Sequence, residues 1–232
     1  MITLVGVGHV FAISDRVKDI IRARHPEVVC LELDMGRYAA LLSRDENRPV
    51  PLQYRLLAYF QKRMAKQYGT EVGHEMVAAA EAASEIGAKV ALIDMDAATV
   101  LTRMWSRMTM RERFKLLTGS VMGLFASKEM VEREVEKYEQ QEESYLENLA
   151  DQFPSVKQVL IDDRNQHMAD RIRKIASEHQ DVLAVIGDGH IQGVSACLTP
   201  LEVETHRLKD IRNAEPAPAA TSEYTASYWY RS

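Results

Sequence analysis

Four short apolar runs recur along the chain. They lie at about residues 2–7, 28–33, 90–93 and 182–187, and valine, leucine and isoleucine dominate them. Continuous apolar runs of this length are typical of strands that are buried on both faces, as in a parallel sheet. The pattern therefore predicts four strands of a mainly parallel central sheet.

The stretches between these runs follow helical spacing. One of them, Glu75 to Ile86, is alanine-rich and is followed by Gly87, as is typical just after the end of a helix. Another helix is predicted at about residues 163–178. Strands that alternate with helices in this way predict βαβ units, and hence an α/β fold with helices flanking the sheet.

Residues 97–150 interrupt this alternation and have a helical pattern throughout. Arg103, Arg107 and Arg111 recur every fourth residue, which places them on one face of a helix. The stretch from 129 to 147 is acidic and contains eight glutamates. Opposite charges on consecutive helices predict a long antiparallel helical hairpin that is inserted into the α/β domain.

We expect a single α/β domain over residues 1–212 and a C-terminal tail over 213–232 that is partly disordered or docked. The tail combines a Pro- and Ala-rich stretch with an aromatic end. The amphipathic pattern at about 100–150 is longer than a small sheet can cover. We expect these helices to mediate self-association, in the simplest case as a symmetric homodimer.

Composition places the chain among soluble globular proteins. It is 46% apolar and 27% charged, and its net charge of −5 provides no general attraction to nucleic acid or anionic lipid. No apolar run approaches the ~20 residues of a membrane-spanning helix, and no basic segment precedes the first run as in a signal peptide. Cys30 lies inside the second run, far from the other cysteine, so no disulfide is expected. These features predict a cytoplasmic protein without nucleic-acid partners or a transmembrane segment.

One four-residue pattern, Gly-x-Gly-His, follows two of the predicted strands. It occurs as Gly6-Val7-Gly8-His9 and again as Gly187-Asp188-Gly189-His190. The turns after parallel strands line the ligand crevice at the carboxyl edge of a sheet, and glycine allows tight turns and close backbone approach. We therefore expect His9 and His190 to face one cavity at this edge. Taken singly, each histidine could simply cap a turn or satisfy a polar group in the core.

Glu32 ends the second predicted strand and is expected at the same edge. Imidazole and carboxylate are common metal ligands, so His9, Glu32 and His190 could hold a divalent ion such as manganese, cobalt or zinc. The same residues could work without metal, with one histidine as general base and a carboxylate that orients it. Both interpretations stay open.

A dinucleotide-binding site is a competing interpretation of the first Gly-x-Gly. Phe11 stands where that motif requires its third glycine, and Gln192 takes the same place in the second copy. A large side chain at this position obstructs the close packing of helix and strand. The partial motif therefore does not favour a dinucleotide cofactor.

These motifs, with further segments, resemble the TraB/PrgY/GumN family, which is related to the TIKI proteases and, more distantly, to the ChaN and erythromycin esterase groups. The matching segments are His9, Val29-Cys30-Leu31-Glu32-Leu33-Asp34-x-x-Arg37, Gly73-His74-Glu75-Met76, Leu92-Ile93-Asp94, Arg103-x-Trp105, Asp163-Arg164-x-x-x-Met168 and Gly187-x-Gly189-His190. Their order over about residues 2–195 makes the combination specific.

The resemblance implies an α/β fold with a helical insertion. The TIKI relatives act as metal-dependent proteases, and PrgY-type members reduce the activity of secreted peptide pheromones. Carried over by position, the implied site residues are His9, His190, Glu32 and Arg164 as catalytic groups, and Arg103 and Glu75 as substrate-binding groups.

Arg164 has two interpretations. It could clamp a substrate carboxylate or stabilise developing negative charge, or it could be a surface arginine that follows an acidic helix start. Two residues depart from the family pattern: Asp163 stands where a glutamate is common, and Met95 where a basic residue is frequent. Many members also carry C-terminal membrane segments, which this chain lacks, so membrane association is not implied.

We therefore expect a hydrolase-like protein, with a metal-dependent peptidase as the leading hypothesis. The alternative hypothesis is a non-catalytic regulatory module that sequesters a peptide or small molecule in the same pocket.

Overall fold

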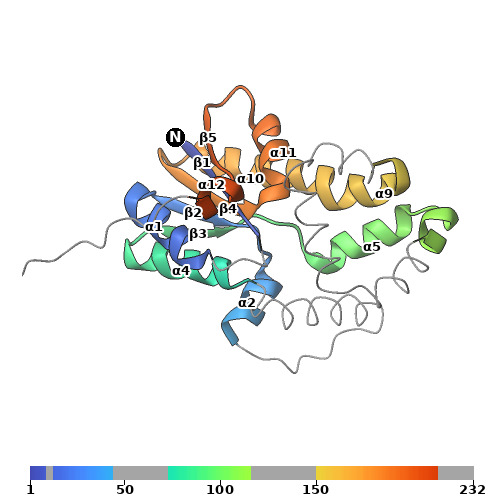
Figure 1. Ribbon diagram of the computed structural model, residues 1–232, viewed down its shortest axis with the longest axis horizontal. Coiled ribbons are helices and arrows are strands. Elements are labelled where there is room, and N and C mark those ends of the chain that lie inside the picture. Colours follow the sequence, from blue (N-terminus) through green and yellow to red (C-terminus); the bar gives the residue numbers. More distant parts are fainter. Residues whose placement is uncertain (9–12, 44–72, 116–149, 214–232) are drawn as a thin grey trace, which may run out of the picture.

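The computed structural model describes residues 1–8, 13–43, 73–115 and 150–213 (Figure 1). Its centre is a five-stranded sheet in the order β3-β2-β4-β1-β5, and each of the strand pairs is parallel. The strands are β1 (Ile2–Val7), β2 (Val28–Leu31), β3 (Lys89–Leu92), β4 (Val182–Gly187) and β5 (Val203–His206). The predicted α/β fold with a mainly parallel sheet is confirmed.

The strand β5 is absent from the sequence prediction. Its four residues, Val203-Glu204-Thr205-His206, contain one apolar side chain, so they form no apolar run. The strand lies at the edge of the sheet and pairs only with β1. An edge strand needs no apolar side chains on both faces, which explains why a search for apolar runs misses it.

Helices cover both faces of the sheet (Figure 1). They are α1 (Ser14–Arg24), α2 (Met35–Ser43), α4 (His74–Glu85), α5 (Ala97–Arg107), α9 (Pro154–Lys157), the π-helix η2 (Gln158–Asp162), α10 (Asp163–Ala176), α11 (Asp188–Leu198) and α12 (Leu208–Asn213). Buried side chains of α1, α4 and α12 pack on one face, and those of α10 and α11 pack on the other.

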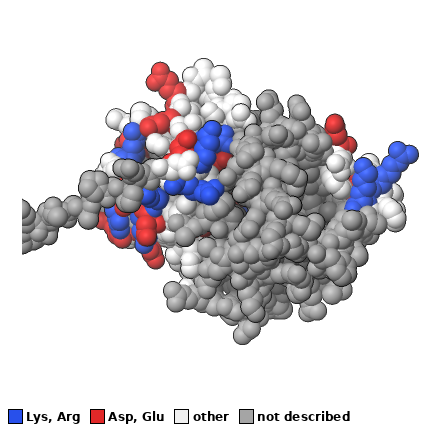
Figure 2. Space-filling view, in the orientation of Figure 1, with Lys and Arg blue, Asp and Glu red and all other residues white. Residues whose placement is uncertain are grey.

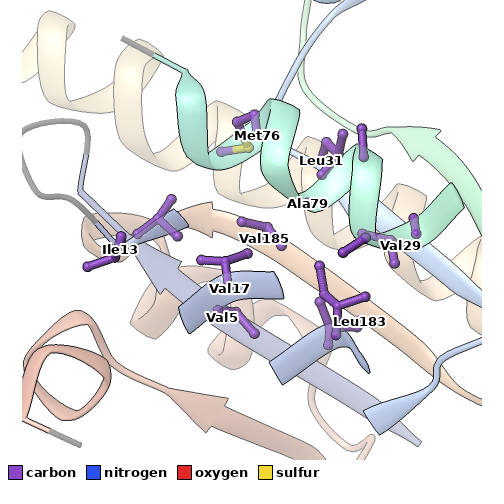
Figure 3. Packing of buried hydrophobic residues seen from close by; sticks show 14 of the residues in the cluster. Val5, Ile13, Val17, Val29, Leu31, Met76, Ala79, Leu183 and Val185 are labelled. Atoms are coloured by element: carbon purple, nitrogen blue, oxygen red, sulfur yellow. The ribbon is translucent and has the colours of Figure 1, made fainter. Parts of the chain in front are cut away.

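Successive residues of a strand enter different cores, because side chains alternate between the two faces of a sheet. In β1, Val5 joins the cluster under α1 and α4, and Leu4 joins the cluster under α10 and α11. Figure 3 shows the first cluster, with Val17 of α1 and Met76 of α4 over the strands. Both faces of the central strands are therefore buried, as their apolar runs predict.

The alanine-rich helix α4 lies against the sheet along its small side chains. Ala79, Ala82 and Ala83 are completely buried. Larger side chains at these positions would hold the helix at a greater distance from the sheet. Gly87 follows the end of α4 with a φ of 73°, in the left-handed region that glycine adopts without strain. The predicted end of this helix is confirmed.

The two ends of the predicted helical insertion meet in the structure. α5 packs against α9 and η2, and the Ser155 hydroxyl donates to the carbonyl of Arg107 at 3.0 Å. The buried Glu112 carboxylate accepts hydrogen bonds from the amides of Thr109 and Ser155 and so joins both ends. The middle of the predicted hairpin, 116–149, and the tail from 214 onward lie outside the described residues.

In the view of Figure 2, basic and acidic side chains lie interspersed on the left of the molecule. Arg107 of α5 binds Asp163 of α10 at 2.7 Å, while the acidic stretch at 129–147, its expected partner, lies outside the described residues.

None of the helices in the described ranges is long and apolar enough to cross a membrane.

Candidate functional site

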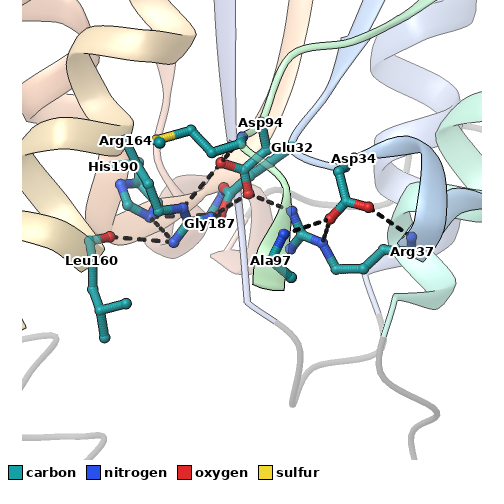
Figure 4. Close-up of polar contacts among 10 residues, drawn as sticks. Glu32, Asp34, Arg37, Asp94, Ala97, Leu160, Arg164, Gly187 and His190 are labelled. Atoms are coloured by element: carbon teal, nitrogen blue, oxygen red, sulfur yellow. Dashed lines mark hydrogen bonds and ion pairs between the residues drawn. The ribbon is translucent and has the colours of Figure 1, made fainter. Parts of the chain in front are cut away.

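Four elements bring polar side chains together at the carboxyl edge of the sheet (Figure 4). Glu32 directly follows β2, Asp94 lies two residues beyond β3, and His190 lies three residues beyond β4. Arg164, at the start of α10, reaches the same place from the helical layer. Glu32, Asp94 and His190 are only 8%, 8% and 6% exposed, so these charges and dipoles interact at low dielectric.

The two strands that lead into the Gly-x-Gly-His segments are neighbours in the sheet. β1 and β4 are neighbouring parallel strands, with Gly6 opposite Ile186 and Val7 opposite Gly187. His9, the first of the two predicted imidazoles, lies outside the described residues. His190 is the member of the pair whose contacts the structure describes.

The second segment is not the turn that its sequence suggests. β4 ends at Gly187 and α11 begins at Asp188, so His190 lies in the first turn of a helix. Gly187 has a φ of −55°, which other residues adopt freely. Glycine is needed here for lack of space, because a Cβ would lie 3.3 Å from Oε2 of Glu32. The Gly187 amide donates a hydrogen bond to the same oxygen.

Arg164 is the centre of the polar cluster. Its Nε and Nη2 donate to the two carboxylate oxygens of Asp94 at 3.0 and 2.6 Å, and Nη2 also donates to Oε1 of Glu32. Its Nη1 donates to the carbonyl of Leu160 at 3.3 Å and to Nε2 of His190 at 3.1 Å. These five contacts match the five N–H groups of a guanidinium. The interpretation of Arg164 as a surface arginine is therefore wrong.

The π-helix η2 supplies one of these contacts. It ends at Asp162, two residues before Arg164, and the acceptor Leu160 lies within it. A π-helix changes the backbone hydrogen-bond pattern locally, and such segments occur frequently at functional sites. Here the segment places a carbonyl group where it receives the Arg164 side chain.

The tautomer of His190 follows from its two neighbours. A guanidinium only donates, so Nε2, which lies 3.1 Å from Nη1 of Arg164, accepts. Nδ1 then carries the proton and donates to Oδ1 of Asn165 at 2.6 Å. Burial lowers the pKa of His190 below its usual value, the Arg164 charge acts in the same direction, and Glu32 opposes both. The imidazole is thus held neutral, with its Nε2 lone pair directed into the cluster.

A second arginine extends the cluster toward α2. Nε of Arg37 donates to Asp34 at 2.6 Å. Its Nη2 donates to Oδ2 of Asp94, which also accepts from Nη2 of Arg164. Although burial opposes ionisation, hydrogen bonds and charge from Arg164 and Arg37 hold the pKa of Asp94 below its usual value. Arg37 likewise lowers the pKa of Asp34 against the effect of burial. With Glu32, the cluster holds three carboxylates and two guanidinium groups, which leaves one excess negative charge.

Asp94, Asn165, Arg37 and Asp34 are site residues that the sequence candidates did not include. Asp94 follows a predicted parallel strand as Glu32 does, so the rule that selected Glu32 could have selected it. Asn165 carries no such signal in the sequence. Its position depends on Gly193 of α11, where a Cβ would lie 2.0 Å from Nδ2 of Asn165.

The two predicted substrate-binding residues lie on other elements. Glu75 is in the first turn of α4 and is 3% exposed. Arg103 is on the exposed surface of α5. No hydrogen bond among the described residues joins either side chain to the cluster around Arg164, and their role in substrate binding stays a prediction.

Two of the three predicted metal ligands are adjacent. Nε2 of His190 lies 3.5 Å from Oε1 of Glu32, and the third, His9, lies outside the described residues. Within the described ranges, no three side chains of histidine, cysteine, aspartate or glutamate form a group suited to a metal ion. A metal centre at this edge therefore stays a prediction.

The profile of the TraB/PrgY/gumN family matches residues 1–208. The chain belongs to this family. The match includes every residue of the cluster around Arg164 and confirms the resemblance drawn from the motifs.

Individual relatives add two comparisons. The chain is 30% identical over 215 residues to the uncharacterized protein MJ1365 of Methanocaldococcus jannaschii, in a match that covers 87% of this chain and 54% of that protein. The chain thus spans about half the length of this relative. Among solved structures, one described as cofacial heme binding to ChaN of Campylobacter jejuni is 11% identical with a TM-score of 0.37, over 88% of this chain and 79% of that chain. The heme is a property of that protein.

Proposed function

We propose that this member of the TraB/PrgY/gumN family is a metal-dependent hydrolase that acts on peptides. The observation that carries the proposal is the pair formed by Nε2 of His190 and Oε1 of Glu32, which lie 3.5 Å apart with the imidazole held neutral. His9 is the proposed third ligand, from the segment that neighbours Gly187 in the sheet.

Three features of the pair fit a divalent ion. Two ligands of one tetrahedral zinc, each about 2.1 Å from the metal, lie about 3.4 Å apart, close to the separation in the structure. The Nδ1–H of His190 is held by Asn165 at 2.6 Å, and a metal-binding histidine usually donates its other ring N–H in this way. The excess negative charge of the cluster also favours a cation over an anion.

The residues of this chain have separate tasks in the proposed reaction. A divalent ion at the pair would supply Lewis-acid polarisation of a substrate carbonyl. Asn165 keeps the His190 lone pair directed at the site, and the Gly187 amide orients Glu32. Asp94 holds the Arg164 guanidinium beside both groups. Peptides are the substrate class because they are what the family resemblance implies.

The proposal is tested with untagged protein and a peptide library, with and without manganese, cobalt or zinc. We expect metal-dependent cleavage, and we expect His190→Gln to abolish it. His179→Gln is the matched control, because His179 binds Glu27 on the exposed surface near the amino ends of β2 and β4. Equal cleavage with and without metal, or by the His190→Gln variant, would contradict the proposal.

The second candidate is a non-catalytic module that sequesters a peptide or small molecule. Arg164 favours it, since each of its five N–H groups has an acceptor within the protein and none is left for a reacting group. Such a site would bind its ligand stoichiometrically. Saturable peptide binding without any product, in every metal tested, would support the module over the hydrolase.

A further inference from the structure

Arg164 contacts the same two atoms that the proposed metal would bind. Its Nη1 lies 3.1 Å from Nε2 of His190, and its Nη2 donates to Oε1 of Glu32. A lone pair of Nε2 cannot accept a hydrogen bond and bind a metal at the same time. The guanidinium and a divalent ion therefore compete for one position.

We propose that Arg164 is an internal cation that occupies the metal position when no metal is bound, so that metal binding requires its release from His190 and Glu32. This inference rests on the proposed function and adds regulation to the same site. In this inference Arg164 opposes metal binding and does not help to form the metal centre.

The remaining contacts of Arg164 make such a release local. The two bonds to Asp94 and the bond to the Leu160 carbonyl involve neither His190 nor Glu32. Asp94 is itself held from other directions by Arg37 and by the amide of Met95 at 2.7 Å. The contact of Nε with Oδ1 of Asp94 uses a nitrogen that touches neither His190 nor Glu32, so it can persist while Nη1 and Nη2 turn away from the metal position.

Arg164 also pairs the charges of this buried site when no metal is bound. Without a cation between them, Glu32 and the His190 lone pair would be left unpaired in a region of low exposure, which is unfavourable. In the metal-free protein Arg164 pairs with both groups. The guanidinium thereby makes the empty site stable and lowers its affinity for metal.

The test is metal titration of untagged protein by calorimetry and by the absorption spectrum of bound Co²⁺. We expect Arg164→Gln to bind Zn²⁺ and Co²⁺ at least tenfold more tightly than the unchanged protein. The matched control is Arg37→Gln, which removes the same charge from the same Asp94 but contacts neither His190 nor Glu32. We expect a smaller gain for this control.

The outcomes separate the inference from the proposed function. Equal gains in both variants would mean a general charge effect and would overturn the inference, as would unchanged or weaker binding by Arg164→Gln. Binding by Arg164→Gln alone, with none by the unchanged protein, would support it. If none of the three proteins binds metal, the metal-dependent function fails and the inference fails with it.

A measurement on the unchanged protein covers the case in which Arg164→Gln does not fold. The guanidinium N–H signals of Arg164 and Arg37 are followed by NMR during the addition of Zn²⁺. We expect the Arg164 signals to shift in proportion to metal occupancy while those of Arg37 stay nearly constant. Occupancy without a change in the Arg164 signals would overturn the inference.

Discussion

At the scale of single residues, each reactive group of the site is oriented by its neighbours. Asn165 accepts the hydrogen bond from Nδ1–H of His190, and Arg164 donates to the lone pair of Nε2. Glu32 is oriented by the Gly187 amide and by Arg164. Because these groups are buried, the loss of one neighbour leaves a polar atom unsatisfied, at a cost of about 1–3 kcal/mol.

The lowered pKa of His190 predicts a loss of stability in mild acid. Burial keeps the imidazole neutral in the folded protein, while the unfolded chain takes up a proton near pH ~6.5. The contribution of His190 to the free energy of unfolding is therefore complete above this pH. It is lost as the pH falls from there toward the lower pKa of the folded state.

Urea unfolding between pH 7.5 and 5 measures this effect. We expect the free energy of unfolding to fall with pH, and His190→Gln to flatten the profile. A residual slope will remain from His167, whose pKa burial also lowers. The half-buried His206→Gln, at the edge strand β5, is the control. An equally steep profile in the His190→Gln variant would contradict the prediction.

At the scale of elements, the contact between α10 and α11 decides the geometry of the imidazole. Asn165 of α10 lies against Gly193 of α11 and fills the space that a Cβ would need. The same asparagine accepts from Nδ1 of His190 on α11. The packing of two helices and the tautomer of a site residue are thus coupled through one side chain.

Gly193→Ala is predicted to destabilise the protein by about 1–3 kcal/mol, the range of overpacked interiors. In an unhindered helix this change would stabilise by roughly 0.5–1 kcal/mol. Here the new Cβ would lie 2.0 Å from Nδ2 of Asn165, so the steric effect is larger. The displaced asparagine would also release His190.

A double-mutant cycle in urea checks this prediction. Asn165→Ala removes the atoms that the new Cβ meets, so the double variant should be more stable than the sum of the two single changes implies. Additive losses would show that the two residues do not interact. The Nδ1–H signal of His190 in NMR reports on the tautomer in each variant.

At the scale of the whole molecule, the site lies where the sheet meets the described ends of the helical insertion. α5 begins three residues after Asp94, and η2 leads directly into α10, whose second residue is Arg164. Figure 1 shows α5 and α9 together on the side of the sheet away from α1 and α4. A movement of the insertion would therefore reach Asp94 and Arg164 through a few residues of backbone.

Self-association through the helices at about 100–150 is the prediction for the assembly. In the described part of this region, Trp105, Met110 and Phe114 are 47%, 76% and 69% exposed, although apolar. Burying such side chains between two copies is favourable by about 25 cal/mol per Å² of apolar surface. Light scattering over a range of concentrations should show a dimer.

The paired change Met110→Asp and Phe114→Asp should shift that equilibrium to the monomer. Leu201→Asp is the control, because Leu201 is also exposed, at 42%, but follows α11 rather than lying in the insertion. A monomer at high concentration in the unchanged protein, or an equal response to the control, would rule out this interface.

The sequence by itself determined the strands that are buried on both faces and the edge at which the site lies. β1, β2, β3 and β4 fall within two residues of the predicted runs. β1, β2 and β4 are buried on both faces and must be apolar throughout, whereas β3 is an edge strand whose residues are exposed or half-buried. Glu32 and His190 follow directly, since parallel strands deliver the residues after them to one edge. The edge strand β5, with a single apolar residue, has no comparable pattern.

Only the tertiary structure decided how the site residues contact one another. The hydrogen bonds from Arg164 to Glu32, from Gly187 to Glu32 and from Arg37 to Asp94 span 132, 155 and 57 residues of sequence. Local periodicity describes the face on which a side chain lies, but such bonds depend on the rotation and spacing of helices packed on the sheet. The pairing of Asn165 with His190 and the five contacts of Arg164 are set by that packing, and so is the competition that Arg164 is proposed to exert.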